Sequence, residues 1–353
     1  MKKNLLLLFA ALLSTIGSWA QDEDMLSTPL TLEAIEAGTI TFDNYANGPV
    51  TYRVNDEKVK TIDSEMTRDI ELKAGDKVVF LGDNVSYVRP DFKDIWGHGF
   101  SQIICTADCY IYGNIMSLVS SSNFTTAGKL EGDYAFYGLF TNNTYLKNHP
   151  SYQLMLPATM LAKYCYANMF RGCTGLTKAP ELPATTLTEL CYYKMFLDCT
   201  GLTKAPILPA VSLVRGCYES MFFGCTGLIK APELPATTLA SEYYSSMFYG
   251  CTNLGSVTCL ATDISTIDAT MYWLYGVSAT GTFYKHPDMK DWPIGASGIP
   301  EGWTVVDYDM TGINAKTADT KKAATTTYDL RGMKSTGGKK GLKVVSGKKI
   351  ITK

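Results

Sequence analysis

The chain has 353 residues, 46% of them hydrophobic, which is enough for two or more folding units with buried cores. Its formal charge of −2 is unevenly distributed: residues 314–353 carry eleven Lys or Arg and two acidic residues, whereas residues 21–313 carry 19 basic and 32 acidic residues. An acidic body of this kind repels polyanions, which argues against nucleic acid as a partner.

Residues 1–20 have the three parts of a secretory signal peptide. Two lysines precede an apolar run from Leu5 to Leu13, and small residues stand at positions 18 and 20. The run is shorter than the roughly 18–20 residues that a membrane-spanning helix needs, and no later stretch approaches that length. We therefore expect an exported protein without a transmembrane segment.

Residues 21–109 alternate apolar and polar side chains, as half-buried strands do. Val50, Tyr52 and Val54 are one such series, and turn pairs such as Asn47-Gly48 lie between the series. This pattern predicts a small all-β sandwich domain. Such a domain would also cover the open first turn of a repeat array that follows it.

Residues 110–262 contain a repeat of 26 residues. A Leu-Pro-Ala tripeptide opens four successive units without insertion or deletion, at Leu156, Leu182, Leu208 and Leu234. A tyrosine, a Met-Phe pair and a Cys-Thr pair recur at matching positions, and a more divergent unit upstream carries four extra residues before Leu156. Since one unit alone cannot bury its apolar side chains, the period predicts units that stack on one another.

Within one unit, Cys191, Met195 and Cys199 are four residues apart, the spacing of one helical face. We expect a short helix there that ends at Thr200-Gly201, because glycine readily takes the left-handed conformation at helix ends. The stretch from residue 202 to Pro206 is then short and extended. Each unit therefore reads as a short strand, a turn and a short helix.

These repeats carry a family resemblance. The sequence Met-Phe-x-x-Cys-Thr-Gly-Leu-Thr-Lys-Ala-Pro-Glu-Leu-Pro-Ala-Thr-Thr-Leu resembles the BspA-like leucine-rich repeat proteins of Bacteroidota surfaces, over roughly residues 134–259. The resemblance implies a right-handed α/β leucine-rich-repeat solenoid, located at the cell surface, at the outer membrane or outside the cell. It also implies adhesion to host or microbial surfaces.

Seven of the ten cysteines occupy two repeated positions, which favours buried thiols over a disulfide framework. The two series are Cys165, Cys191 and Cys217, and Cys173, Cys199, Cys225 and Cys251. Cys105 and Cys109 either form a local bridge or lie in strands at the end of the first domain. No second short-spaced pair accompanies them, so a zinc site is not expected.

The C-terminal part divides into three segments. Residues 263–309 contain Trp273, Trp292 and Trp303 and are expected to form a cap, in which the tryptophans either close the core or stack on sugar rings. Residues 310–327 are small and polar, as in a linker. Residues 328–353 resemble the C-terminal sorting domain of type IX secretion; the alternative is a basic β-hairpin without a receptor.

The sequence shows no catalytic, cofactor-binding or metal-binding motif, and its three histidines are scattered. We therefore expect no enzyme, although a pair of carboxylates in a glycosidase arrangement is not excluded by sequence. Positions that vary between units are expected to face solvent and to offer a ligand surface; they include Lys163, Glu189, Arg215 and Tyr193. Three lysines instead repeat, Lys178, Lys204 and Lys230, and they form either a basic ladder for an anionic ligand or a solvated strand surface.

The expected function is a binding or adhesion module for a host or microbial protein or glycan at a cell surface. The alternatives are a carbohydrate-binding or carbohydrate-degrading surface component and a purely structural surface protein.

Overall fold

The computed structural model describes residues 25–92, 99–264, 266–310, 341–345 and 348–352. The chain divides into two compact units, Met1–Tyr308 and Asp309–Lys353. The expected signal peptide, nearly all of the expected linker and much of the sorting-like segment lie outside the described residues. In the second unit, β17 (Gly341–Val345) and β18 (Lys348–Thr352) form an antiparallel hairpin.

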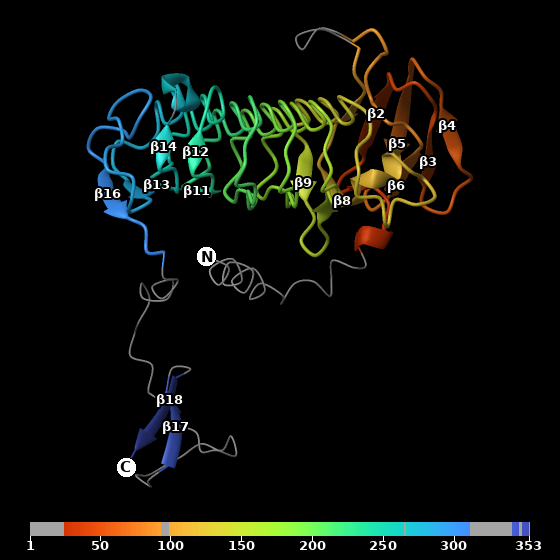
Figure 1. The fold of residues 1–353 in the computed structure, drawn as a ribbon. Coiled ribbons are helices and arrows are strands. Elements are labelled where there is room, and N and C mark those ends of the chain that lie inside the picture. The colour runs from red at the N-terminus through yellow and green to blue at the C-terminus, as the bar shows by residue number, and fades with distance from the viewer. Residues whose placement is uncertain (1–24, 93–98, 265, 311–340, 346–347, 353) are drawn as a thin grey trace. The chain divides into compact units, whose positions relative to one another are not determined.

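The described part of the first unit is mostly β, with almost no helix (Figure 1). Single turns of 3₁₀ helix occur at η2 (Ile115–Leu118) and η3 (Ile267–Thr270). No described helix has the length and hydropathy that crossing a membrane requires.

Two sheets form the N-terminal part, as the alternating pattern predicts. The larger has the strand order β10-β8-β1-β6-β3-β4, with β9 also paired to β8, and the smaller has the order β5-β2-β7. Phe42 on β2 and Phe80 on β6 meet between the sheets with ring centroids 5.4 Å apart. The strands are β1 (Thr31–Ala34), β2 (Gly38–Asn44), β3 (Val50–Val54), β4 (Lys60–Ile62), β5 (Met66–Leu72), β6 (Lys77–Gly82), β7 (Gln102–Cys105), β8 (Cys109–Asn114), β9 (Leu146–Asn148) and β10 (Leu154–Met155).

Strand β8 joins the sheets to the repeats. One of its edges pairs antiparallel with β1, and the other pairs parallel with β9 and β10, which belong to the first repeat units. The sequence placed the end of the first domain at Cys109, the residue at which β8 begins. The sheet therefore continues beyond that boundary.

The repeat units stack in parallel. β11 (Lys230–Leu234) pairs with β13 (Ser256–Cys259), and β13 pairs with β15 (Thr282–Lys285), so that Ser256 lies between Lys230 and Thr282 at intervals of 26 residues. β12 (Thr238–Leu239) pairs in the same way with β14 (Asp263–Ile264), and β16 (Thr304–Asp307) pairs with β15 at the C-terminal end. The repeat thus continues one turn beyond Cys259.

Stacked aromatic rings run through the core of the repeats. Phe170, Phe196, Phe222 and Phe248 form one series, with successive centroids 5.6 Å apart. A second series begins in the N-terminal part and ends in the cap: Tyr87, Phe136, Tyr166, Tyr192, Tyr218, Tyr244, Trp273 and Trp292. Each such pair contributes about 0.5–1.5 kcal/mol beyond the burial of its surface.

The tryptophans of the C-terminal part are core residues. Trp273 is completely buried and its indole N–H donates to the Gly298 carbonyl at 2.8 Å. Trp303 is also buried, and its indole N–H donates to the Ser278 carbonyl. The sequence leaves two interpretations open for these tryptophans, closure of the core and stacking on sugar rings. Their burial favours closure of the core.

The segment expected to be helical in each unit is a succession of turns. Met195 N–H donates to the Tyr192 carbonyl within its unit, whereas Phe196 N–H donates to the Met221 carbonyl of the next unit. Every fourth residue has a positive φ, as at Leu190 (57°), Lys194 (54°) and Asp198 (58°). The helix prediction is therefore wrong. A four-residue spacing places side chains on one face of a helix, and equally on one face of these turns, so the spacing does not distinguish the two structures.

Gly201 has a different role from the one expected. It is not among the residues with positive φ, so it does not end a helix in the left-handed conformation. A Cβ at this position would instead collide with the Thr174 carbonyl oxygen of the preceding unit. Glycine is needed here because two backbones approach closely.

Candidate functional site

The four extra residues of the upstream unit lie in the loop between β9 and β10. Leu146 of β9 is fixed beside Cys109, and Leu154 of β10 is fixed beside Gly113, so both ends of the loop are held by the same strand, β8. The chain between these points extends past the neighbouring turns of the stack (Figure 1). The spacing departs from 26 residues here, since Phe136 and Tyr166 are 30 apart.

His149 organises the loop from within. Its Nδ1 accepts the backbone N–H groups of Ser151 and Tyr152 at 3.1 and 2.9 Å, so the neutral ring carries its proton on Nε2. The imidazole stacks on the Tyr152 ring at 4.4 Å and packs against Tyr110 and Tyr112 of β8. Burial is the main cause that lowers the pKa of His149 below its ordinary value.

Asn148 connects the loop to the next unit. Its Oδ1 accepts the backbone N–H groups of Thr177 and Lys178 at 2.8 and 2.9 Å, and its Nδ2 donates to the Lys178 carbonyl. The amide therefore takes the place of a strand ladder between the two units. These bonds hold the loop and the segment after Leu176 at a fixed separation.

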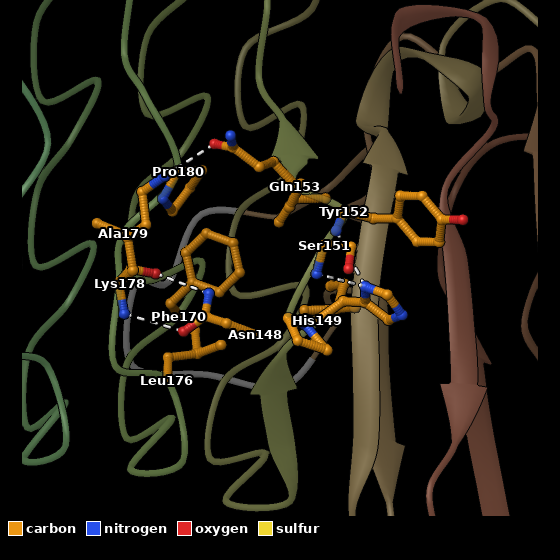
Figure 2. A pocket seen from close by; sticks show the side chains of 13 residues that line it. Asn148, His149, Ser151, Tyr152, Gln153, Phe170, Leu176, Lys178, Ala179 and Pro180 are labelled. Carbon is orange, nitrogen blue, oxygen red and sulfur yellow. Dashed lines mark hydrogen bonds between the residues drawn. The ribbon is translucent and has the colours of Figure 1, made fainter. Parts of the chain in front are cut away.

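A cavity of about 350 Å³ lies between the loop and this segment (Figure 2). Its apolar lining comes from core residues and from the two prolines Pro150 and Pro180. Its polar lining comes from Asn148, His149, Ser151, Tyr152, Gln153 and Lys178. The Lys178 ammonium donates to Gln153 Oε1 at 2.9 Å and so connects the two sides of the cavity. Figure 2 shows the Phe170 ring between them, while the Tyr152 ring extends away from the cavity toward β8.

The three repeated lysines do not have equivalent surroundings. The backbones of Lys178 and Lys204 are bridged, as a ladder requires, and Lys230 lies in β11. Lys204 and Lys230 are exposed, whereas Lys178 is half-buried and lines the cavity. Of the residues proposed from sequence as a ligand surface, Lys178 alone lines this cavity.

Three of the variable residues form ion pairs with one another. Lys163 lies 3.1 Å from Glu189, Glu189 lies 3.8 Å from Arg215, and Arg215 lies 2.7 Å from Glu242. Hydrogen bonds to the carboxylates raise the pKa of Lys163 and of Arg215. Because these pairs are largely exposed, each stabilises the stack by no more than about 1 kcal/mol.

Tyr193 does not face solvent as its variability suggested. It is 8% exposed and packs in a small cluster with Val88, Tyr137 and Ala167, while the Lys194 ammonium lies 4.6 Å from its ring centroid. Tyr193 is a packing residue.

All ten cysteines are free and buried. In the longer series each thiol donates to the carbonyl of the preceding unit's core phenylalanine, for example Cys199 to Phe170 at 2.9 Å and Cys225 to Phe196 at 3.0 Å. The thiol is thus both a small apolar side chain and a weak donor to a buried acceptor. This fits the interpretation of repeated core thiols.

Cys105 and Cys109 lie at the facing ends of β7 and β8 without a bridge. A hydrogen bond between the two thiols lowers the pKa of Cys105 and raises that of Cys109. The Asn143 amide also donates to Cys105 Sγ at 3.4 Å. Both cysteines therefore pack at the joint between the sheets and the repeats.

Across the described parts of the chain, no group of three or more His, Cys, Asp or Glu side chains is arranged to hold a metal ion. The sequence interpretation missed His149, Tyr152 and Gln153, although the four-residue insertion that carries them was visible as a break in the period. The chain matches no protein-family model, no curated protein and no solved structure.

Proposed function

We propose that this chain is an exported binding protein of the cell surface, and that the cavity beside the inserted loop is its ligand site. The observation that carries the proposal is the position of the cavity at the insertion between Phe136 and Tyr166. His149 and Asn148 hold the loop in place through hydrogen bonds to backbone groups. A small concave site with an apolar floor and a few fixed polar groups is the usual form of a ligand pocket.

The proposal retains the leucine-rich-repeat class and the BspA-like resemblance, with the helical segments replaced by turns. It also retains export, which rests on the sequence of residues 1–20, and surface attachment, which rests on the resemblance of residues 328–353 to a sorting domain. The expected ligand of such a surface protein is a glycan or a protein segment.

Binding is favoured over hydrolysis at this site. Among the described residues, those that line the cavity include no aspartate or glutamate. A glycosidase requires two carboxyl groups about 5–9.5 Å apart, so the cavity lacks the groups for that reaction.

The test is a screen of the secreted chain against glycans and extracellular matrix proteins, with two variants in parallel. Deletion of residues 149–152 restores the 26-residue spacing and removes the loop, and it should abolish binding. The exposed ion pairs provide the control: Arg215→Gln should bind as the parent does. Binding that survives the deletion, with the same thermal unfolding midpoint, would contradict the assignment of the site.

A further inference from the structure

The cavity has a distinct electrostatic character. Among the described residues that line the cavity, Lys178 is the one with a permanent charge. None of these residues is an aspartate or a glutamate. Other lysines at this joint have acidic partners, such as Lys147, whose ammonium lies 3.3 Å from Asp108. Within the described parts of the chain Lys178 has an amide partner, Gln153 Oε1, but forms no ion pair. A half-buried ammonium without a counter-ion favours an anionic ligand.

The remaining lining groups suit a sugar ring. The Gln153 amide and the Ser151 hydroxyl can donate and accept hydrogen bonds, as the hydroxyl groups of a sugar require. Pro150, which is exposed, and Leu154, which is 9% exposed, supply apolar contacts for the C–H groups of the ring, whereas Phe170 and Leu176 are buried beneath them.

Size and net charge restrict the ligand further. A volume of about 350 Å³ is at the lower end of the range for small-molecule sites, so it accommodates about one sugar unit. The acidic body, with 19 basic and 32 acidic residues in 21–313, repels a polyanion but tolerates one negative charge at a lysine. A chain-terminal acidic unit meets both conditions.

We propose that the cavity binds the terminal acidic monosaccharide of a glycan, a hexuronate or a nonulosonate, with the carboxylate on the Lys178 ammonium. Gln153 then turns from the lysine to the sugar hydroxyl groups, and Pro150 and Leu154 contact the ring. This inference rests on the proposed function of the same cavity and adds the class of its ligand.

Calorimetric titration of the full secreted chain tests the inference, with glucuronic acid, its methyl ester and N-acetylneuraminic acid as probes. One of the two acids should bind, and Lys178→Met should weaken that binding at least about tenfold, since one charge-assisted hydrogen bond is lost. If glucuronic acid binds, its ester should be weakened to the same degree. Lys204→Met is the matched control, because Lys204 has the equivalent position one unit later and is exposed; it should bind within about twofold of the parent.

Several results would overturn the inference. These are an ester that binds as tightly as the acid, equal effects of Lys178→Met and Lys204→Met, and the absence of binding by both acids at millimolar concentration. If the broader screen finds a ligand that is lost on deletion of residues 149–152 but does not depend on Lys178, the ligand class is wrong and the binding function stands. If the deletion has no effect on any ligand, both proposals fail.

Discussion

Replacement of Tyr192 by phenylalanine is expected to stabilise the repeats. The Tyr192 ring is buried between those of Tyr166 and Tyr218, at centroid distances of 5.8 and 5.9 Å. Its hydroxyl is buried without a hydrogen-bond partner in the described structure, as are those of Tyr166, Tyr218 and Tyr244. Phenylalanine keeps the stacked ring and removes the hydroxyl.

The size of the effect follows from the burial of that hydroxyl. A hydroxyl buried without a partner costs about 1–3 kcal/mol in proteins, whereas the ring contacts are unchanged by the substitution. We expect Tyr192→Phe to raise the free energy of unfolding by about 1–3 kcal/mol. Phe136 supports the reasoning, because it holds the matching position upstream, is completely buried and stacks on Tyr166 at 5.8 Å.

Urea unfolding followed by circular dichroism measures this difference. The parent and Tyr192→Phe should have the same dependence on urea, with the variant unfolding at a higher concentration. Tyr275→Phe is the control, since Tyr275 is 51% exposed and its substitution should change stability by less than about 0.5 kcal/mol. A loss of more than about 0.5 kcal/mol in Tyr192→Phe would refute the reasoning, because the hydroxyl would then make a favourable bond in solution.

Three further predictions concern the thiols, the loop and the joints between units. Because burial raises the pKa of the core thiols, to about 12 for Cys251, the seven repeated cysteines should resist iodoacetamide at pH 8 in the native chain and react in urea; mass spectrometry that finds native labelling would contradict this. The folded pKa of His149 is below its ordinary 6.5, so the unfolded chain binds more protons; the stability present above pH 6.5 should decline as the pH falls below it, and His149→Asn should remove this part of the pH dependence of the unfolding midpoint. Gly201→Ala should lower stability by about 1–3 kcal/mol in urea titrations because the Cβ meets the Thr174 carbonyl, whereas Gly128→Ala, whose Cβ would have its nearest neighbour at 3.9 Å, should not show this loss.

Much of the core could be predicted from the sequence. The recurring Leu, Tyr, Met-Phe and Cys positions are buried because each meets its counterpart from the next unit, as Phe196 meets Phe222. The alternation of apolar residues before Cys105 likewise predicts the strands of the two sheets. Apolar residues recur every 26 residues in the repeats and every second residue in the strands because those positions are buried. Both periods can therefore be recognised in a single sequence.

The turn structure could not be predicted in the same way. Cys191, Met195 and Cys199 are spaced equally well for a helix and for turns that repeat every four residues. In a helix every backbone N–H group donates to a carbonyl of the same segment. In the turns every second N–H group, such as that of Phe196, donates to a carbonyl of the next unit. Local spacing therefore does not separate them. Tyr193 was misplaced for a related reason, since its burial depends on neighbours such as Tyr137, far away in the sequence.

The inserted loop shows how a periodic structure acquires a cavity without losing its core. Across the insertion Phe140 and Phe170 are still 5.5 Å apart, about the same as the 5.6 Å between Phe170 and Phe196 in the regular part. The extra residues are thus accommodated entirely outside the aromatic series, where Asn148 and His149 hold them by hydrogen bonds to backbone. In the regular units each segment packs directly on its equivalent, whereas here the segment of Lys178 faces a loop of different length and sequence. A binding site requires side chains that differ from one another and converge on one space, and stacking of identical units opposes that arrangement. The break in the period after Asn148 removes this constraint beside the cavity.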